Sequence, residues 1–390
     1  MKARLWIEGR KETMQNVKNG TLHYKKPTLL FHAASLGEYE QCIPLIEQIK
    51  KCFPNKYSIV VSFYSPSGYE VRKNHSLADQ IIYLPFDFRE HISTFLNTLK
   101  PSFIFLAKYE FWHHLISEAH KRKIPIFSFS TILRKEQVFF KSYGSFFKKA
   151  LTKVNYFFVQ NEETGALLTS IGCSTKLVGD TRFDRVMSIA NKRQHLETII
   201  QFKNKKRLIV IGSSWPKDLE YLIPYINQSS QELKFIIAPH NIDAKQIDEF
   251  KKQIEANSQL YSTFKLNKES KVLFIDNIGM LSSIYAYADI AYIGGAFGSG
   301  LHNILEAAVY HIPVVFGPKY RKFQEAKDLV QLGGAFSVND YANLKKTLDS
   351  LLLNKDTYNE ASNASKRYIE KHVGATEKIM MHISPLLSQS

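Results

Sequence analysis

Residues 290–309 read IAYIGGAFGSGLHNILEAAV and decide the fold of this chain. Four apolar residues predict a buried parallel strand, a glycine-rich turn follows, and the last six residues predict the start of a helix. Glycine lets a backbone approach a phosphate, and the free N–H groups of a first helical turn point at it. Tight packing alone would also explain the glycines. The polar residues His302, Asn303 and Glu306 favour a nucleotide site, with Glu306 placed to accept hydrogen bonds from ribose hydroxyls.

Short apolar runs alternate with amphipathic stretches along the whole chain. Parallel strands that helices cover on both faces have this pattern, and such sheets bind ligands at the carboxyl ends of their strands. The sequence therefore predicts an α/β fold with two doubly wound, Rossmann-like domains that face each other across a cleft. The expected parts are a first domain at 1–187, a linker at 188–206, a second domain at 207–365, and a C-terminal helix at 366–390 that packs back toward the first domain. The predicted strands are 28–33, 58–63, 81–84, 103–107, 124–129 and 156–159 in the first half, and 208–212, 235–238, 272–275, 290–293 and 314–316 in the second.

The composition is that of a soluble globular protein with an excess of positive charge. The 390 residues suit two domains, and 44% of them are hydrophobic and 23% charged. The three cysteines show no CxxC spacing, which indicates a reducing cytosol and argues against a thiolate metal site. The net charge of +16 predicts an anionic partner, which is nucleic acid, an acidic membrane surface or a phosphorylated substrate. The sequence holds no run of 18 apolar residues and no apolar signal-peptide stretch around Trp6, so a membrane partner would be bound at its surface.

Polar residues follow the first two predicted strands. Glu38 lies at the start of a helix after Ser35 and Gly37, where it either complements the helix dipole or serves as a general base at the mouth of the cleft. Ser65 and Ser67 follow the second strand, and their hydroxyls either cap a helix or hold a sugar or a phosphate. The residues by themselves leave both alternatives open.

Charged and polar residues also end later strands. Lys108 and Glu110 close the fourth strand and form either an ion pair within the domain or part of a ligand site. Arg182 places a cation at another strand end, where it can neutralise a leaving phosphate or a carboxylate. In the second half, the loops 239–241 and 276–280 are typical of a nucleotide site, and backbone groups beside the glycine of the second loop could contact a base edge.

Two groups of side chains have more than one interpretation. Histidines and glutamates gather at 113–120 and at 302–311, but neither group has the spacing of a recognised zinc site, so we expect no metal. The segment 134–149 interleaves phenylalanines with lysines. Its aromatic residues follow helical spacing, so they either pack in the core or meet a membrane interface.

Several motifs occur together and in order along the chain. They are HAASLGE at 32–38, SFYSPSGYE at 62–70, YLPFD at 83–87, GDTRFD at 179–184, HNILEAA at 302–308 and Gly317-Pro318. In this combination the chain resembles, over roughly residues 28–340, the Kdo transferase family, whose members add 3-deoxy-D-manno-octulosonic acid (Kdo) to the lipid A precursor. The resemblance implies a GT-B fold and an inverting transfer that needs no cofactor and no metal in the chemical step. It assigns the acceptor to the first domain and CMP-Kdo to the second.

The roles of family residues carry over onto the matching positions of this chain. Glu38 matches the general base, and Lys108 and Arg182 match groups that steady the transition state. We assign acceptor binding to Ser35, Gly37, Ser65, Ser67 and Glu110, and CMP binding to Ser213, Pro239, His240, Ile278, Gly279, Met280, Asn303, Ile304, Leu305 and Glu306.

The chain also departs from the family pattern. Many members have two acidic residues where Lys108 and Glu110 stand, Lys where Arg182 stands, and an Arg in the loop that here contains His240. Members usually begin with an apolar membrane anchor, which this sequence lacks.

The resemblance implies a phosphorylated lipid A precursor as acceptor and a location at the cytoplasmic face of the inner membrane of a Gram-negative bacterium. The chain would bind that anionic surface peripherally, or through an N-terminal anchor missing from this sequence. One alternative is another GT-B transferase with a different nucleotide sugar. A second alternative is not an enzyme but a basic nucleic-acid-binding protein. We find no recognisable module for that role, so we expect no nucleic-acid partner.

Overall fold

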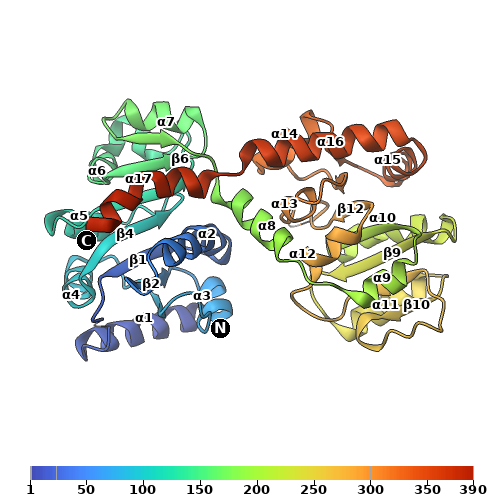
Figure 1. Ribbon diagram of the computed structural model, residues 1–390, viewed down its shortest axis with the longest axis horizontal. Helices are drawn as coiled ribbons and strands as arrows, with labels where there is room; N and C mark the ends of the chain where they lie inside the picture. Colours follow the sequence, from blue (N-terminus) through green and yellow to red (C-terminus); the bar gives the residue numbers. More distant parts are fainter. Residues whose placement is uncertain (1, 23, 299, 390) are drawn as a thin grey trace. The chain divides into compact units, whose positions relative to one another are not determined.

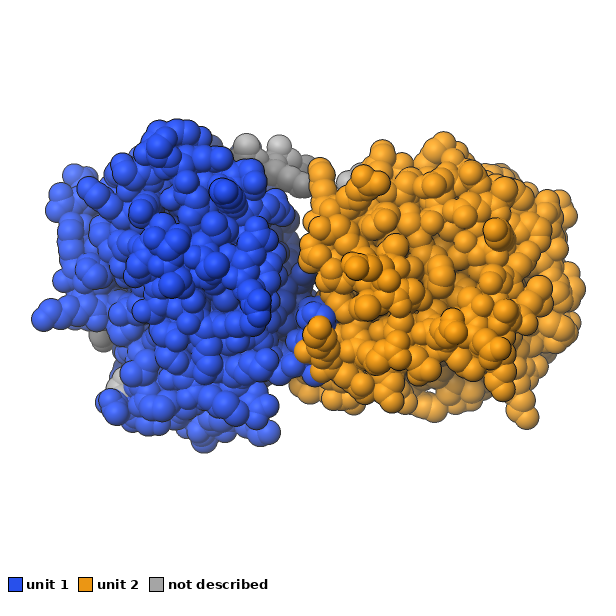
Figure 2. All heavy atoms as spheres, turned by 90° about the horizontal axis from the view of Figure 1, so that it is seen from above, with its two compact units in different colours: residues 1–185, 372–390 blue, residues 186–371 orange. Residues whose placement is uncertain are grey.

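The computed structural model describes residues 2–22, 24–298 and 300–389. The chain folds into two compact units, and each contains one seven-stranded sheet (Figure 1). The strand pairs in both sheets are parallel, which confirms the predicted α/β fold with two doubly wound sheets. Unit 1, blue in Figure 2, comprises Met1–Arg185 and His372–Ser390, and unit 2, orange, comprises Val186–Lys371.

The sheet of unit 1 has the strand order β3-β2-β1-β4-β5-β6-β7. Its strands are β1 (Thr28–Ala33), β2 (Ser58–Phe63), β3 (Gln80–Tyr83), β4 (Pro101–Ala107), β5 (Ile126–Thr131), β6 (Tyr156–Val159) and β7 (Thr175–Leu177). Its helices are α1 (Lys2–Lys18), α2 (Leu36–Cys52), α3 (Pro66–Arg72), α4 (Arg89–Leu99), α5 (His113–Lys121), the 3-10 helices η1 (Val138–Phe140) and η2 (Ser142–Gly144), α6 (Ser145–Leu151), α7 (Glu162–Thr169) and α17 (Ala375–Gln389).

Apolar side chains cover both faces of this sheet. Every residue of β1 is buried, because helices lie on each side of it. Successive side chains of a strand point to opposite faces. Leu29 and Phe31 therefore join the core that contains residues of α2 and α17, whereas Leu30 joins the core that contains residues of α4 and α5.

The sheet of unit 2 has the strand order β10-β11-β9-β8-β12-β13-β14. Its strands are β8 (Arg207–Ser214), β9 (Leu233–Pro239), β10 (Ser258–Leu260), β11 (Val272–Phe274), β12 (Ile290–Ile293), β13 (Val314–Phe316) and β14 (Ala335–Ser337). The helix α8 (Thr181–Asn191) begins in unit 1 and continues into unit 2. The other helices are α9 (Glu197–Lys203), α10 (Pro216–Gln228), α11 (Ala244–Gln253), η3 (Tyr261–Thr263), α12 (Leu281–Ile284), η4 (Tyr285–Tyr287), α13 (Leu305–Ala308), α14 (Gln324–Gln331), α15 (Tyr341–Leu353) and α16 (Lys355–His372).

The structure contains a strand at each position that the sequence predicts. The bounds of β1, β2, β6, β12 and β13 are those predicted, and the other predicted strands differ at their ends. The stretch 188–206 holds the end of α8 and the whole of α9, and four of its apolar residues are buried: Ala190, Leu196, Ile199 and Phe202.

The chain returns to unit 1 through its last helix, α17, drawn in red in Figure 1. Four apolar residues of α17 are buried in the core that α2 shares, namely Ile379, Met380, Ile383 and Leu387. Asp184 caps the start of the helix, because its carboxylate accepts the N–H groups of Gly374 (2.6 Å) and Thr376 (2.7 Å). The carboxylate thus ties the segment that leaves unit 1 to the segment that returns.

Candidate active site

Glu38 lies just beyond the carboxyl end of β1, in the first turn of α2. Its side chain folds back over the turn, where Oε2 accepts the N–H of Ala34 at 2.5 Å. Ser35 is the N-cap residue of α2 but makes no side-chain cap, and Gly37 is exposed in the first turn. Glu38 thus bonds the main chain of the turn that precedes the helix, and the residue is buried at 6% exposure.

The surroundings of Glu38 adjust its acidity. Burial is the largest cause that raises the pKa of Glu38 above its ordinary value, and the charge of Glu110 adds to it. The Ala34 N–H and the Lys108 ammonium oppose this rise in pKa without cancelling it. A carboxylate with a raised pKa is a stronger base than an exposed one, which suits proton abstraction near neutral pH.

The loop after β4 holds a strained residue. Lys108 has φ +58°, in the left-handed region, and its N–H donates to the carbonyl of Phe129 at 2.9 Å. Strain of this kind concentrates at functional sites. Glu110 places Oε2 3.8 Å from His32 Nε2, and no ion pair joins Glu110 to Lys108 within the described residues. Lys108 and Glu110 thus do not form the simple ion pair that one interpretation of the sequence predicts.

His32 lies beside Glu110 and is held by contacts with several residues. Trp112 Nε1 donates to His32 Nε2 at 2.9 Å, so the ring carries its proton on Nδ1, which lies 3.1 Å from the carbonyl oxygen of Ser62. Trp112 also stacks on Tyr64 with a centroid distance of 4.8 Å. Sequence reasoning did not assign a role to His32 or Trp112, although His32 begins the motif HAASLGE.

Ser65 and Ser67 follow β2. Ser65 is the N-cap residue of α3 but makes no side-chain cap; instead the two hydroxyl oxygens lie 2.8 Å from each other. The predicted side-chain cap is therefore not formed, and Ser67 is exposed at the carboxyl edge of the sheet.

Arg182 stands in the first turn of α8, on a buried aspartate that sequence reasoning missed. Arg182 Nε donates to Asp180 Oδ2 at 2.8 Å, and the Arg182 N–H donates to Oδ1 at 2.9 Å. Gln41 adds a third hydrogen bond at 2.8 Å. Burial alone would raise the pKa of Asp180, but Arg182 and these hydrogen bonds hold it below its ordinary value. Asp180 thereby fixes the guanidinium at the strand edge.

In unit 2, three strand-end loops meet through aromatic rings. Trp215, after β8, stacks on His240, after β9, with a centroid distance of 4.4 Å. The ring of His302 lies 4.6 Å from that of His240 and accepts a 3.1 Å hydrogen bond from Trp215 Nε1. Burial, and then His240, lowers the pKa of His302. The structure thus brings together the ends of β8 and β9, which hold Ser213 and Pro239, and the loop that holds His302. The sequence assigned Trp215 no part in nucleotide binding.

The glycine-rich turn that follows β12 packs tightly. A Cβ on Gly294 would lie 2.3 Å from the carbonyl oxygen of Ser213, and Gly295 adopts φ +94°, so both positions require glycine. Ser299, in the same turn, lies outside the described residues. Packing therefore explains two of the glycines. Ser213 itself has φ +51°, a second strained strand-end residue.

The predicted ribose-contacting pair lies at the start of α13. Asn303 Nδ2 donates to Glu306 Oε1 at 3.1 Å, and Asn303 Oδ1 accepts the N–H of Leu305 at 3.2 Å. The side chains of Ile304 and Leu305 are buried, so at these two positions only the backbone could contact a nucleotide.

The loop 276–280 is largely exposed to solvent. Ile278 is 90% exposed, Gly279 has φ +95°, and Met280 contacts the amide of Asn277 at 2.9 Å. The part of this loop in a nucleotide site stays a prediction.

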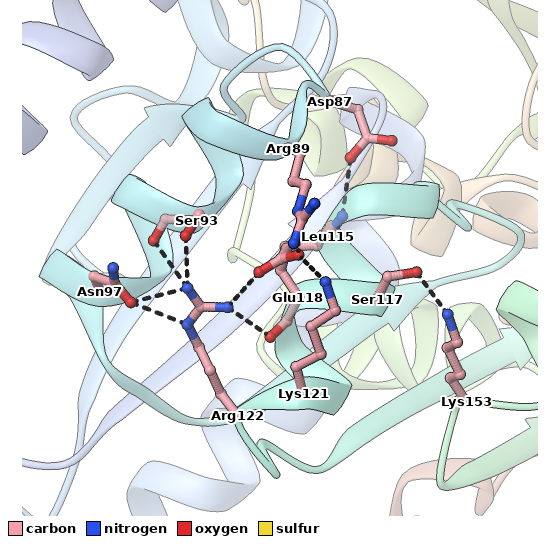
Figure 3. Close-up of polar contacts among 10 residues, drawn as sticks. All are labelled: Asp87, Arg89, Ser93, Asn97, Leu115, Ser117, Glu118, Lys121, Arg122 and Lys153. Atoms are coloured by element: carbon pink, nitrogen blue, oxygen red, sulfur yellow. Dashed lines mark hydrogen bonds and ion pairs between the residues drawn. The ribbon is translucent and has the colours of Figure 1, made fainter.

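Glu118, which the sequence grouped with three histidines, instead meets three cations (Figure 3). Its carboxylate lies 2.6 Å from Lys121, 2.7 Å from Arg122 and 3.3 Å from Arg89. In the described part of the chain, no group of three or more His, Cys, Asp or Glu residues is arranged to hold a metal ion. The helices described here include none that is long and apolar enough to cross a membrane.

Known proteins resemble this chain in sequence and in fold. Residues 8–185 match the family described as 3-deoxy-D-manno-octulosonic-acid transferase (kdotransferase). The 3-deoxy-D-manno-octulosonic acid transferase of Chlamydophila psittaci is 25% identical over 339 residues, covering 84% of this chain and 77% of the relative. That of Aquifex aeolicus is 26% identical over 349 residues, covering 88% of each.

Two solved structures share the arrangement of both sheets. The UDP-GlcNAc 2-epimerase of Neisseria meningitidis, bound to UDP-GlcNAc, matches with a TM-score of 0.60 at 15% identity, covering 88% of this chain and 98% of the other. The Anabaena protein HepE, in complex with UDP, matches with a TM-score of 0.58 at 14% identity, covering 94% of this chain and 100% of the other.

Two doubly wound units with parallel sheets, together with these two structural matches, define the GT-B fold class. Within that fold class, residues 8–185 match the Kdo transferase family, and the chain is similar to Kdo transferases along most of its length, as the resemblance of its motifs predicts.

Proposed function

We propose that this protein transfers Kdo from CMP-Kdo to a phosphorylated lipid A precursor, in synthesis of the lipopolysaccharide inner core, with Glu38 as the general base. An acceptor hydroxyl oxygen forms a bond to the anomeric carbon of Kdo, and the bond from that carbon to the phosphate oxygen of CMP breaks. The hydroxyl proton passes to Glu38, and the configuration at the carbon inverts. Such general-base assistance contributes about 10²–10⁴-fold to the rate.

The burial of Glu38 at the end of β1 is the observation that carries this proposal. A carboxyl group is seldom buried without a cationic partner at short range. Burial raises the pKa of Glu38, the charge of Glu110 adds to the rise, and Lys108 opposes it. An acidic residue that served only the helix dipole would be as effective at the surface.

The leaving phosphate needs positive charge rather than a proton donor, because CMP departs as an anion. Lys108 and Arg182 supply cations in unit 1, and Asp180 holds Arg182 in a fixed orientation. On unit 2, His240, backbone groups near Ser213, and the pair Asn303 and Glu306 are the groups to which we assign the nucleotide.

Product analysis tests the base directly. Glu38→Gln is expected to lower transfer from CMP-Kdo to a lipid A precursor by at least about 10²-fold, measured by mass spectrometry of the product. CMP should still raise the melting temperature of the variant, as of the wild type, whereas UDP and oligonucleotides should not. Glu90→Gln is the matched control, because Glu90 is also an acidic residue in the first turn of a helix, α4. Wild-type-like turnover in Glu38→Gln would reject the assignment.

We also propose that unit 1 binds the anionic surface of the inner membrane at its cytoplasmic face. Three residues that follow β5 form an exposed aromatic patch: Tyr143, Phe146 and Phe147 at 77%, 53% and 44% exposure. Lys148 and Lys149 flank it and are exposed. Aromatic rings among lysines suit the interface between headgroups and acyl chains.

Phe139 and Phe140 of the same segment behave differently. They are only partly exposed and pack against the core of unit 1. Within the segment 134–149, Phe139 and Phe140 therefore fit the interpretation as core residues. The membrane proposal rests on the aromatic patch alone.

A further inference from the structure

Asp218 is a completely buried carboxylate in the first turn of α10. Its Oδ2 accepts the N–H of Trp215 at 2.9 Å, as an acidic residue at this helix position commonly does. The same oxygen accepts the N–H of Gly295 at 2.8 Å, and Oδ1 accepts the hydroxyl of Tyr292 at 3.0 Å. One carboxylate thus joins the turn after β8 to the turn after β12, through main-chain groups on both sides.

Other contacts hold the same two turns together. The Gly294 N–H donates to the carbonyl of Gly212 at 2.9 Å, which continues the pairing of β12 with β8. Gly294 leaves no space for a side chain beside Ser213. Trp215 adds the hydrogen bond to His302. The backbone of both turns is consequently set by a small number of short contacts, with Asp218 at the centre.

We infer that Asp218 is a positioning residue for the nucleotide donor: it sets the backbone of the two turns that receive the donor's phosphate. Asp218 does not touch the donor. This inference rests on the proposed function, because it takes these turns to be the donor site. An ionised carboxylate carries only acceptors, so it can hold both N–H groups at one oxygen. An asparagine that kept its amide oxygen on both N–H groups would turn its NH2 toward the Tyr292 hydroxyl, which would then have to accept. The two main-chain hydrogen bonds would remain but would lose their ionised acceptor, and hydrogen bonds to charged groups are roughly twice as strong as neutral ones.

The test compares Asp218→Asn with a control in the same unit. Asp289 also accepts a backbone N–H, that of Leu208 at 2.8 Å, and pairs with Lys203 at 2.9 Å, but it lies at the amino ends of the strands. For Asp218→Asn we expect the dissociation constant for CMP and the KM for CMP-Kdo to rise about tenfold, the scale of replacing an ionised acceptor by a neutral one, with the KM for the acceptor unchanged. Asp289→Asn should lower the melting temperature and leave CMP affinity unchanged.

The outcomes separate this inference from the proposed function. A wild type that neither binds CMP nor transfers Kdo rejects the proposed function. A wild type that binds CMP, with Asp218→Asn binding it equally well, overturns the inference alone. Equal losses for donor and acceptor would also overturn it, because they indicate a helix cap that matters only for stability.

A second variant covers the case in which Asp218→Asn does not fold. Tyr292→Phe removes one of the three donors that orient the carboxylate and keeps the ring in place. We expect it to fold and to weaken CMP binding by at least about twofold, which corresponds to a part of one hydrogen bond. Unchanged CMP affinity in Tyr292→Phe would overturn the inference.

Discussion

Glu38 and Glu90 occupy the same kind of position, the first turn of a helix, yet their surroundings differ. Glu90 is exposed, whereas Glu38 is buried and bonded to the main chain of its own turn. Position along a helix therefore does not determine what a glutamate can do. Burial and nearby charge do, because they act on the free energy of the ionised form.

The acidity of Glu38 predicts the pH dependence of the reaction. A base must be ionised, so activity is present above its pKa and is lost as the pH falls through it. Since burial raises the pKa of Glu38, the acid limb of kcat/KM should lie above the usual range of a glutamate. Lys108 opposes the shift, so Lys108→Met should move the limb to still higher pH. A pH–rate profile of both proteins checks this, and an acid limb at the same pH in both would contradict it.

Glu306 leads to a prediction on the donor side. Glu306→Ala should weaken the binding of CMP by roughly 1.5–3 kcal/mol, the usual cost of losing a charged hydrogen-bond partner. Isothermal calorimetry measures this directly. Unchanged affinity would leave Glu306 with the lesser role of stabilising the start of α13 and its contact with Asn303.

The sequence predicted site residues that lie near the end of a strand. It did not predict residues whose contacts join segments far apart in the chain. Glu38 and Lys108 follow predicted strands directly, so their place at the carboxyl edge could be predicted. Asp218 and Gly295 are 77 residues apart, and their hydrogen bond exists only because β8 and β12 pair. A single sequence contains no local pattern that marks such a contact.

At the scale of elements, the same reasoning predicted every central strand and the edge strand β3, and it missed the other three edge strands. The missed strands β7, β10 and β14 have three residues each and include polar ones, so they form no apolar run. The residues of β7 are partly or fully exposed, because an edge strand has a neighbour on one side only. Burial on both faces produces the pattern that a sequence displays, and these strands lack it.

The packing of α4 on α5 depends on Glu118 (Figure 3). Arg122 holds Glu118 on α5 and also donates to Ser93 and Asn97 on α4. Hydrogen bonds from Lys121 and Arg122 lower the pKa of Glu118 to about 2, although burial acts against them. The carboxylate is thus a bridge between the two helices.

Glu118→Gln should reduce the free energy of unfolding by about 1–3 kcal/mol at pH 7, because it leaves cations without their buried partner. The pKa of Glu118 is lower in the folded state than the usual value of about 4.3. Its stabilising contribution is therefore complete above that value and is lost as the pH falls toward about 2. Urea unfolding at several pH values should show the difference between wild type and variant shrinking on acidification. A difference that stays constant down to pH 3 would contradict this account, and the exposed Glu90→Gln is the control.

At the scale of the whole molecule, the net charge of +16 calls for an anionic partner. A phosphorylated lipid acceptor and an anionic membrane surface both meet that requirement. Of these two partners, the membrane has the larger charged surface. The aromatic patch of Tyr143, Phe146 and Phe147 gives the protein an apolar contact with the membrane, and lysines flank that patch.

The protein should therefore bind vesicles that contain anionic lipids, and the binding should weaken as salt increases, since each basic residue near the surface contributes about 1 kcal/mol. The double variant Phe146→Ser with Phe147→Ser should bind less and keep its fold, because both rings are largely exposed. Leu353→Ser is the matched control, an exposed apolar residue in unit 2. Sedimentation with vesicles measures this, and a wild type that does not sediment at low salt would refute membrane attachment through the patch.

The return of α17 to unit 1 has a consequence for synthesis of the chain. Its four core residues, Ile379, Met380, Ile383 and Leu387, complete the core around β1 and β2, so unit 1 cannot close while residues 375–389 are still within the ribosome. Unit 2 lies wholly upstream of that helix and emerges complete. The half of the protein that is translated first is thus the half that finishes folding last, and a nascent chain released just before Ala375 would carry a finished unit 2 beside a unit 1 with an open apolar face.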